Sequence, residues 1–186
     1  MPPDFENLPT PGEKIAAREE ILAFEKTLGI SIEDSSSTSG SVEDSILKKI
    51  RDESKNTAEL GTRFENLTKD FFETDKLYKS RFVKVWRWME FPDRETRDLG
   101  IDLVAEEEDG SLCAIQCKCY ADANSIDMKH VSTFLALASE SKKFKNKILV
   151  YTGDTPTGNA LTILKKHHCT IIRQEDFRAS SIDWSK

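Results

Sequence analysis

Residues 100–104 read Gly-Ile-Asp-Leu-Val, and residues 112–119 read Leu-Cys-Ala-Ile-Gln-Cys-Lys-Cys. A turn dipeptide, Asp109-Gly110, lies between these two apolar runs. Apolar runs that flank an Asp-Gly turn are typical of a β-hairpin. The sequence therefore predicts two antiparallel strands here, and the elements before and after them complete the architecture.

The predicted hairpin gathers three polar side chains. Side chains alternate between the two faces of a strand, so Gln116 and Lys118 point to the same face. Asp102 lies on the neighbouring strand, within reach of this pair. A carboxylate, an amide oxygen and an ammonium group at one sheet end suit a hard cation and a phosphate ester. The opposite face of the second strand carries Cys113, Ile115, Cys117 and Cys119.

The residues before the hairpin predict a helix and a first strand. Four apolar residues recur at steps of four, three and four, which is the spacing of an amphipathic helix. They are Leu60, Phe64, Leu67 and Phe71. Glu65 lies at the margin of their buried stripe. Residues 82–89 are rich in aromatic and β-branched residues and predict a strand, in which Trp86 and Trp88 share a face as core or as an interface.

The residues after the hairpin alternate between helix and strand patterns. We expect a helix over about 127–139, an apolar strand over 147–152, a helix over 157–167 and a short strand over 170–172. The order is helix, three strands, helix, strand, helix, strand. This order predicts an α/β fold with a mixed central sheet and helices on both sides.

Composition divides the chain into three parts. Residues 10–13, Thr-Pro-Gly-Glu, are a helix start, and residues 35–41 are a Ser-rich linker. We therefore expect an acidic N-terminal helical extension with its linker over 1–41 and a main domain over 42–178, and the family resemblance described below makes residues 179–186 a junction toward a further domain.

Charge is distributed unevenly between these parts. The net charge is −6, and the first 60 residues hold 13 acidic and 7 basic side chains, so residues 61–186 are neutral. The neutral part contains two basic clusters, which either contact phosphates or form an ordinary solvated surface. They are Lys142, Lys143, Lys145 and Lys147, and Lys165, Lys166, His167 and His168.

The chain shows no sign of secretion or of a membrane anchor. It has no run of about 18 apolar residues, and its N-terminus lacks the basic and apolar regions of a signal peptide. Three of its 4 cysteines lie on one strand, too close in sequence for disulfide bonds that would link distant parts of the fold. A reduced, cytoplasmic compartment is the better interpretation. A zinc site is disfavoured because Cys117-x-Cys119 has no partner at zinc-ligand spacing.

The motifs resemble the PD-(D/E)XK nuclease superfamily, and within it the branch named for the Mrr restriction enzyme. The resemblance lies in Glu65 on the first helix, Gly-Ile-Asp102, and Gln116-Cys117-Lys118. It implies a restriction-endonuclease-like αβββαβ core over most of residues 42–178. Residues 58–75 are similar to the N-terminal nuclease module of helicase-containing, type I single-polypeptide restriction enzymes.

This resemblance implies an Mg²⁺-dependent endodeoxyribonuclease. Asp102, Gln116 and Glu65 would bind Mg²⁺, with Mn²⁺ as a substitute. Lys118 would orient or deprotonate the attacking water and stabilise negative charge. Because Gln116 replaces a carboxylate, we expect weaker metal affinity in the absence of DNA.

The resemblance also implies partners. We expect DNA as the substrate, with a helicase or translocase and methyltransferase or specificity domains in the same polypeptide, in a prokaryotic cytoplasm. The chain would be the cleavage domain of a larger restriction or phage-defence enzyme. Lys129, Ser132 and Tyr120 are candidate DNA contacts, although solvation explains Lys129 and Ser132 better and packing explains Tyr120 equally well.

Two alternatives remain open at the level of sequence. The chain could be a catalytically silent nuclease-fold domain that binds DNA or docks a motor, or a nuclease that acts on RNA or on particular structures. Asp98 is a rival to Asp102 as the acid, and a loop position explains it better.

Overall fold

The computed structural model describes residues 46–94, 100–120, 126, 128–153, 156–178, 180 and 182. The predicted extension over 1–41, the rival acid Asp98 and most of the junction lie outside these residues. Within the described part, no helix combines the length and apolar character that crossing a membrane requires.

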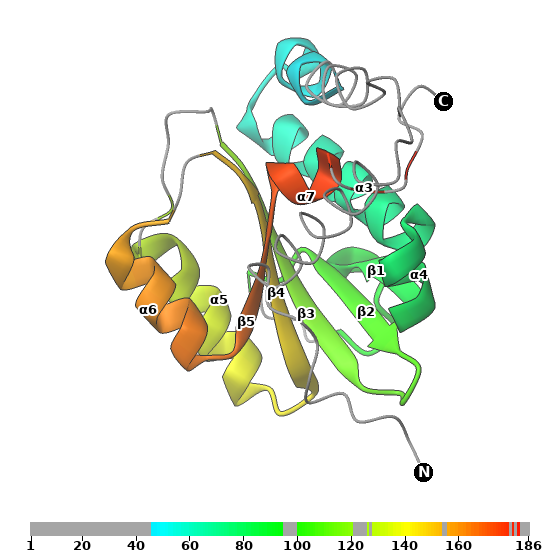
Figure 1. Cartoon of the computed structure of the whole chain (residues 1–186), viewed down its shortest axis with the longest axis vertical. Helices are drawn as coiled ribbons and strands as arrows, with labels where there is room; N and C mark the ends of the chain where they lie inside the picture. The colour runs from blue at the N-terminus through cyan, green and yellow to red at the C-terminus, as the bar shows by residue number, and fades with distance from the viewer. Residues whose placement is uncertain are drawn as a thin grey trace, which may run out of the picture. The chain divides into compact units, whose positions relative to one another are not determined.

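A five-stranded mixed sheet forms the centre of the fold (Figure 1). Its strands run in spatial order as β1 (Phe82–Arg87), β2 (Leu103–Glu107), β3 (Leu112–Cys119), β4 (Phe144–Thr152) and β5 (Cys169–Arg173). The first three pair antiparallel, and β3, β4 and β5 pair parallel. The predicted mixed sheet and element order are therefore confirmed.

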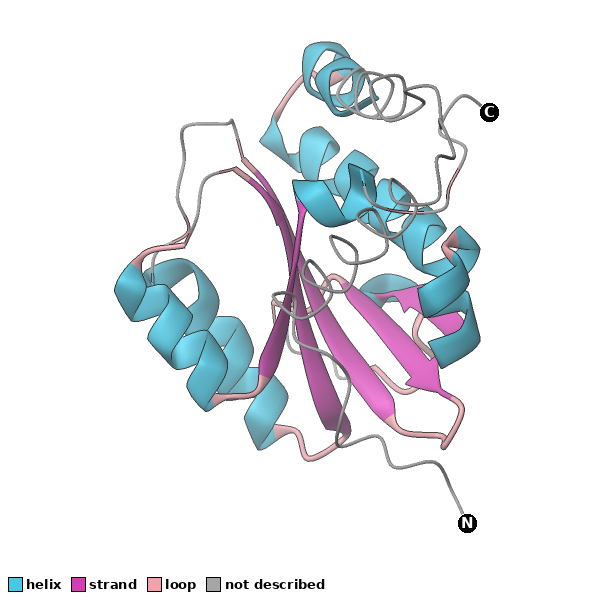
Figure 2. Cartoon of the chain, in the orientation of Figure 1, coloured by secondary structure: helices cyan, strands magenta, loops and turns pink. Residues whose placement is uncertain are grey.

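Helices cover both faces of this sheet (Figures 1 and 2). On one side lie α3 (Thr57–Thr74), α4 (Lys76–Arg81) and α7 (Gln174–Arg178), and on the other lie α5 (Met128–Glu140) and α6 (Gly158–Lys166). Each side has its own apolar core. The α3 side contains Phe64, Phe71 and Phe177, and the α5 side contains Phe134 and Leu164.

Helix α3 begins where a polar side chain can cap it. The side chain of Asn56 accepts a hydrogen bond of 2.9 Å from the backbone N–H of Glu59, which satisfies one free donor of the first turn. Asp75 ends the helix and caps α4. The sequence predicted α3 but neither α4 nor α7.

The hairpin forms as predicted, and its turn needs glycine at Gly110, where φ is +76°. The alternation of faces is also confirmed, because Cys113, Ile115 and Cys117 lie in the α3-side core and Ala114 lies in the α5-side core.

Two predicted strand boundaries were wrong. Strand β1 stops at Arg87, and Trp88–Glu90 form a 3-10 turn, η2. Trp86 and Trp88 therefore do not share a strand face, but both contact Phe91 in the α5-side core. Strand β4 begins three residues earlier than predicted, at Phe144.

Candidate active site

The backbone of Asp102 is held between η2 and β3. Its N–H donates to the carbonyl of Ile115 at 2.9 Å, and its carbonyl accepts from the N–H of Trp88 at 2.8 Å. The register places Leu103 opposite Ile115, so Asp102 lies beside Gln116. The ladder thus brings Asp102 to β3, as the sequence predicted.

The side chain of Asp102 is fixed in the same way. Its Oδ2 accepts a hydrogen bond of 2.6 Å from the backbone N–H of Cys117. This N–H lies between Gln116 and Lys118 along β3. The carboxylate is therefore anchored in the middle of the Gln-Cys-Lys motif by the main chain.

The side chain of Gln116 is buried, with 4% of its surface exposed, rather than lying at a wet sheet edge. Its Nε2 donates to the carbonyl of Gly100 at 3.0 Å, which fixes the orientation of the amide. Its Oε1 is buried and has no hydrogen-bond partner among the described residues. A buried acceptor without a partner is destabilising, and a cation would satisfy it.

Gly100 is needed for this close approach. Its φ is +64°, and a Cβ there would lie 3.4 Å from the Nε2 of Gln116. A larger residue would be strained in its backbone and would press on the amide. Gly100 therefore supports the orientation that leaves Oε1 unpaired.

Glu65 and Lys118 complete the group. Glu65 is half-buried on α3, and its pKa is raised to about 7, first by burial and then by the negative charge of Asp102. The charges of Arg87 and Lys118 oppose this shift. The structure therefore brings Glu65, Asp102 and Lys118 within electrostatic reach of one another.

Arg87 was missed by the sequence analysis. It ends β1 and pairs in register with Leu103, the residue after Asp102. A strand predicted to end at Arg87 instead of Met89 would have placed it beside the hairpin's polar end. The strand itself was predicted from the sequence, but its end was placed at Met89, two residues too late.

The thiol of Cys117 lies on the opposite face of β3 from Gln116 and Lys118, in the α3-side core. Burial raises its pKa well above the ordinary value, and the charge of Asp102 adds to this effect. A thiol in this state is a poor nucleophile and a poor metal ligand. The cysteine side chain therefore belongs to the core, and only its backbone N–H serves the site.

The donors fit a hard cation. No group of three or more His, Cys, Asp and Glu residues in the described part of the chain could hold a metal ion. The group here instead combines two carboxylates, Glu65 and Asp102, with the buried Oε1 of Gln116. Mg²⁺ prefers oxygen donors, and the unpaired Oε1 is the atom that such an ion would satisfy.

The residues expected to contact DNA occupy varied positions. On α5, Lys129 is exposed and Ser132 is half-buried. Tyr120 follows β3 and packs against the α5-side core. Their contact with DNA stays a prediction.

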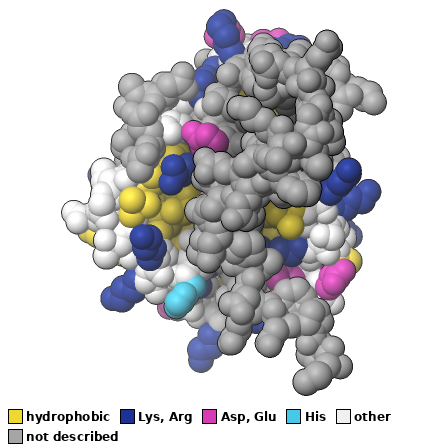
Figure 3. Space-filling view, in the orientation of Figure 1, with side chains coloured by type: hydrophobic (Ala, Val, Ile, Leu, Met, Phe, Trp, Pro, Cys, Tyr) yellow, Lys and Arg dark blue, Asp and Glu magenta, His cyan; other side chains and the backbone are white. Residues whose placement is uncertain are grey.

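The basic clusters are partly neutralised. Lys143 pairs with Asp93 at 3.1 Å, and Lys145 pairs with Asp109 at 3.0 Å. Among the coloured atoms of Figure 3, Lys and Arg lie scattered around the outline rather than in one continuous patch. The solvated-surface interpretation is favoured for these two lysines.

Residues 73–186 match the sequence model of an Mrr-type family described as restriction endonuclease. The match includes Asp102, Gln116 and Lys118 and begins after Glu65. A comparison with curated protein sequences found no significant match.

Solved structures show the same fold. The structure titled "ATP-dependent Type ISP restriction-modification enzyme LlaBIII bound to DNA" superposes with a TM-score of 0.62 and 30% identity, over 75% of this chain and 9% of that one. The MspJI restriction endonuclease in complex with a 27-mer oligonucleotide gives 0.51 and 19%, over 80% and 34%. The modification-dependent restriction endonuclease AspBHI gives 0.50 and 16%, over 74% and 34%. The chain thus spans at most about a third of these relatives.

Proposed function

Because the chain belongs to the restriction endonuclease family, we propose that it is a metal-dependent endonuclease module that hydrolyses phosphodiester bonds in DNA. One observation carries this proposal. The carboxylate of Asp102 is anchored at 2.6 Å to the N–H between Gln116 and Lys118, while the buried Oε1 of Gln116 has no hydrogen-bond partner among the described residues. Such a group is unfavourable by itself and suits a site that a cation completes.

Asp102, Gln116 and Glu65 would hold Mg²⁺, or Mn²⁺ in its place. When bound, Mg²⁺ supplies positive charge at the scissile phosphate. Asp102 would be the central ligand because its position is set by backbone contacts to η2 and β3. Gln116 would contribute its Oε1, because the bond from Nε2 to the carbonyl of Gly100 fixes the amide and leaves Oε1 without a partner among the described residues.

Lys118 would act on the reacting atoms. Its ammonium group lies two residues from Gln116 on the same face of β3, where it can donate to the phosphate and orient the attacking water. Glu65, with a pKa of about 7 in the metal-free protein, can hold a proton on its carboxylate near neutral pH. It would lose this proton when a cation binds beside it.

The wider context is also a proposal. The likeness to the Type ISP enzyme LlaBIII supports a cleavage domain in a larger restriction enzyme, with a helicase motor and methyltransferase or specificity domains in the same polypeptide. We assign the nuclease domain to residues 42–178, preceded by the extension over 1–41 and followed by the junction over 179–186. Residues Lys129, Ser132 and Tyr120 remain candidate DNA contacts, and a prokaryotic cytoplasm is the expected location.

The test is plasmid cleavage by the intact polypeptide. Supercoiled plasmid should be nicked in Mg²⁺ and left intact in EDTA. Asp102→Asn should lose nicking, because the amide no longer offers an anionic ligand. Asp109→Asn is the matched control, since it removes a carboxylate at the other end of the hairpin. Nicking by Asp102→Asn at the rate of the unsubstituted protein would contradict the proposal.

A further inference from the structure

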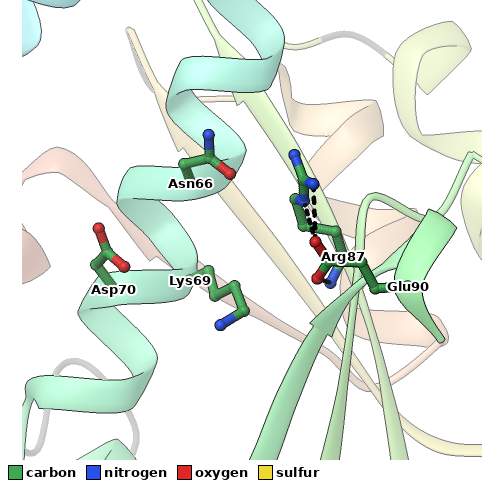
Figure 4. Close-up of a pocket in the computed structure, with 5 residues that line it drawn as sticks. All are labelled: Asn66, Lys69, Asp70, Arg87 and Glu90. Carbon is green, nitrogen blue, oxygen red and sulfur yellow. Dashed lines mark hydrogen bonds and ion pairs between the residues drawn. The ribbon is translucent and has the colours of Figure 1, made fainter.

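An open groove of about 420 Å³ lies between α3 and the end of β1. Asn66, Lys69 and Asp70 line it from α3, and Arg87 and Glu90 line it from the other wall (Figure 4). Neither the fold nor the four candidate catalytic residues require this groove, so its side chains need a separate explanation.

The groove adjoins the candidate active site. Asn66 directly follows Glu65, and Lys69 lies about one turn further along α3. On the other wall, the charge of Arg87 acts on Glu65, and the residue after Arg87 donates its N–H to the carbonyl of Asp102. A polymer that reaches the active site would therefore pass along the groove.

A carboxylate within the groove is bonded to its arginine. The Nε and Nη2 of Arg87 donate to Oε1 of Glu90 at 2.9 and 2.7 Å, and the backbone N–H of Arg87 donates to Oε2 at 3.3 Å. These bonds lower the pKa of Glu90, and the positive charge of Lys69 lowers it further. Glu90 is thus an anion bonded to Arg87 and within electrostatic reach of Lys69, whose own ion-pair partner is Glu73 at 2.6 Å.

We propose that Glu90 holds the place of a DNA backbone phosphate, which replaces it on Arg87 and is also attracted by Lys69 when duplex DNA reaches the active site. The inference rests on the proposed function, because it takes DNA as the ligand. A guanidinium binds a phosphate through the same N–H groups that it offers to a carboxylate. Breaking the Arg87–Glu90 ion pair costs little free energy, because the two side chains are 36% and 44% exposed and an exposed ion pair contributes little to stability.

The experiment measures binding of a short labelled duplex to the intact polypeptide by fluorescence anisotropy, in EDTA and over a range of salt. Arg87→Ala and Lys69→Ala should each weaken binding by about threefold or more, and each should reduce the slope of log affinity against log salt by about 0.9. Glu90→Gln should tighten binding by about two- to fivefold, because the competing charge is removed.

Matched controls lie outside the groove. Asp109→Asn neutralises an exposed, ion-paired carboxylate at the far end of the hairpin, and Lys79→Ala removes an exposed lysine from α4. Neither should change affinity in the way the groove variants do. Lys69→Ala leaves the Arg87–Glu90 pair intact, so it preserves the test if thermal melting shows that Arg87→Ala does not fold.

Unchanged affinity and salt slope in Lys69→Ala and in a folded Arg87→Ala would overturn the inference. Failure of Glu90→Gln to tighten binding would also overturn it, as would the absence of salt-sensitive binding by the unsubstituted protein. The binding assay in EDTA does not require cleavage, so these results are independent of the nicking test. If the groove variants bind DNA like the unsubstituted protein while Mg²⁺-dependent nicking is present, only this inference is wrong. If the groove variants change binding as expected but the protein does not nick plasmid, only the proposed function is wrong.

Discussion

The carboxylate of Asp102 and the backbone N–H of Cys117 form a hydrogen bond of 2.6 Å across 15 residues of chain. It joins the start of β2 to the centre of β3. Because the donor is a backbone group, the position of the carboxylate depends on the strand and not on the cysteine side chain. The acid and the Gln-Cys-Lys motif are thus one unit held by the sheet.

A first prediction separates the two faces of β3. Cys117→Ser should lower the free energy of unfolding by about 1–2 kcal/mol, because it places a hydroxyl among buried apolar groups. Cys119→Ser, at a half-buried position, should have a smaller effect. Both variants should retain metal-dependent nicking, measured beside thermal melting. Loss of nicking in folded Cys117→Ser would show that the thiol takes part in the site.

The second prediction concerns Gln116. Gln116→Glu should bind Mn²⁺ about tenfold more tightly than the unsubstituted protein, because it adds a ligand charge. Without metal it should melt at a lower temperature at neutral pH, because it buries a carboxylate near Asp102. Gln116→Leu has similar size and should bind Mn²⁺ more weakly.

Calorimetry with Mn²⁺ in the presence of DNA, combined with thermal melting in EDTA, separates these effects. If Gln116→Leu binds Mn²⁺ as tightly as the unsubstituted protein, Oε1 is not a ligand.

The third prediction follows from the raised pKa of Glu65. Its pKa is about 7 in the folded protein, against the ordinary glutamate value of 4.5 that applies in the unfolded chain. Between these values the unfolded chain releases the proton while the folded chain keeps it, so stability is lost as pH rises through this window. The melting temperature of the unsubstituted protein, measured without metal, should therefore fall relative to Glu65→Gln between about pH 4.5 and 7.

Glu59 provides a control of opposite sign on the same helix. Bonds from the backbone of Lys55 and from Arg63 lower the pKa of Glu59, so its contribution is lost as pH falls. A melting difference for Glu65→Gln that does not vary with pH would contradict the burial of this carboxylate.

A fourth prediction places the start of the folded domain. Removal of residues 1–40 should leave the melting temperature nearly unchanged, because these residues precede the described core. Leu47→Ala should lower the free energy of unfolding by about 2–5 kcal/mol, because Leu47 is 1% exposed within the α3-side core. A large fall in melting temperature for the truncated protein would show that the extension packs on the domain.

Local patterns in the sequence predicted most of the fold. The apolar spacing that includes Phe64 predicted α3, and the Asp-Gly turn and the alternation of side chains predicted the hairpin and its two faces. The sequence did not predict η2, because Trp88 and Met89 favour a strand by propensity while the chain turns at Arg87 to pack Trp88 against Phe91. Tertiary packing overrode local preference at this point.

The sequence predicted which residues make up the candidate site, but it did not predict the surroundings of Gln116 or the place of Arg87. The order of Glu65, Asp102, Gln116 and Lys118 indicated which side chains could meet. The orientation of Gln116 depends on the bond from its Nε2 to the carbonyl of Gly100, 16 residues away in the chain, which no local pattern encodes. The role of Arg87 depends on strand register and was missed for the same reason.

Lys118→Ala tests the central claim most directly. Cleavage should fall by about a hundredfold or more, because the ammonium group stabilises charge that develops in the reaction. The fold and DNA binding should survive, since this side chain is half-buried at the end of the sheet. The measurement is the nicking rate of supercoiled plasmid by the intact enzyme in Mg²⁺, with anisotropy and thermal melting on the same samples. Loss of nicking with binding retained is the predicted result, and nicking by Lys118→Ala at the unsubstituted rate would contradict the assignment of this site.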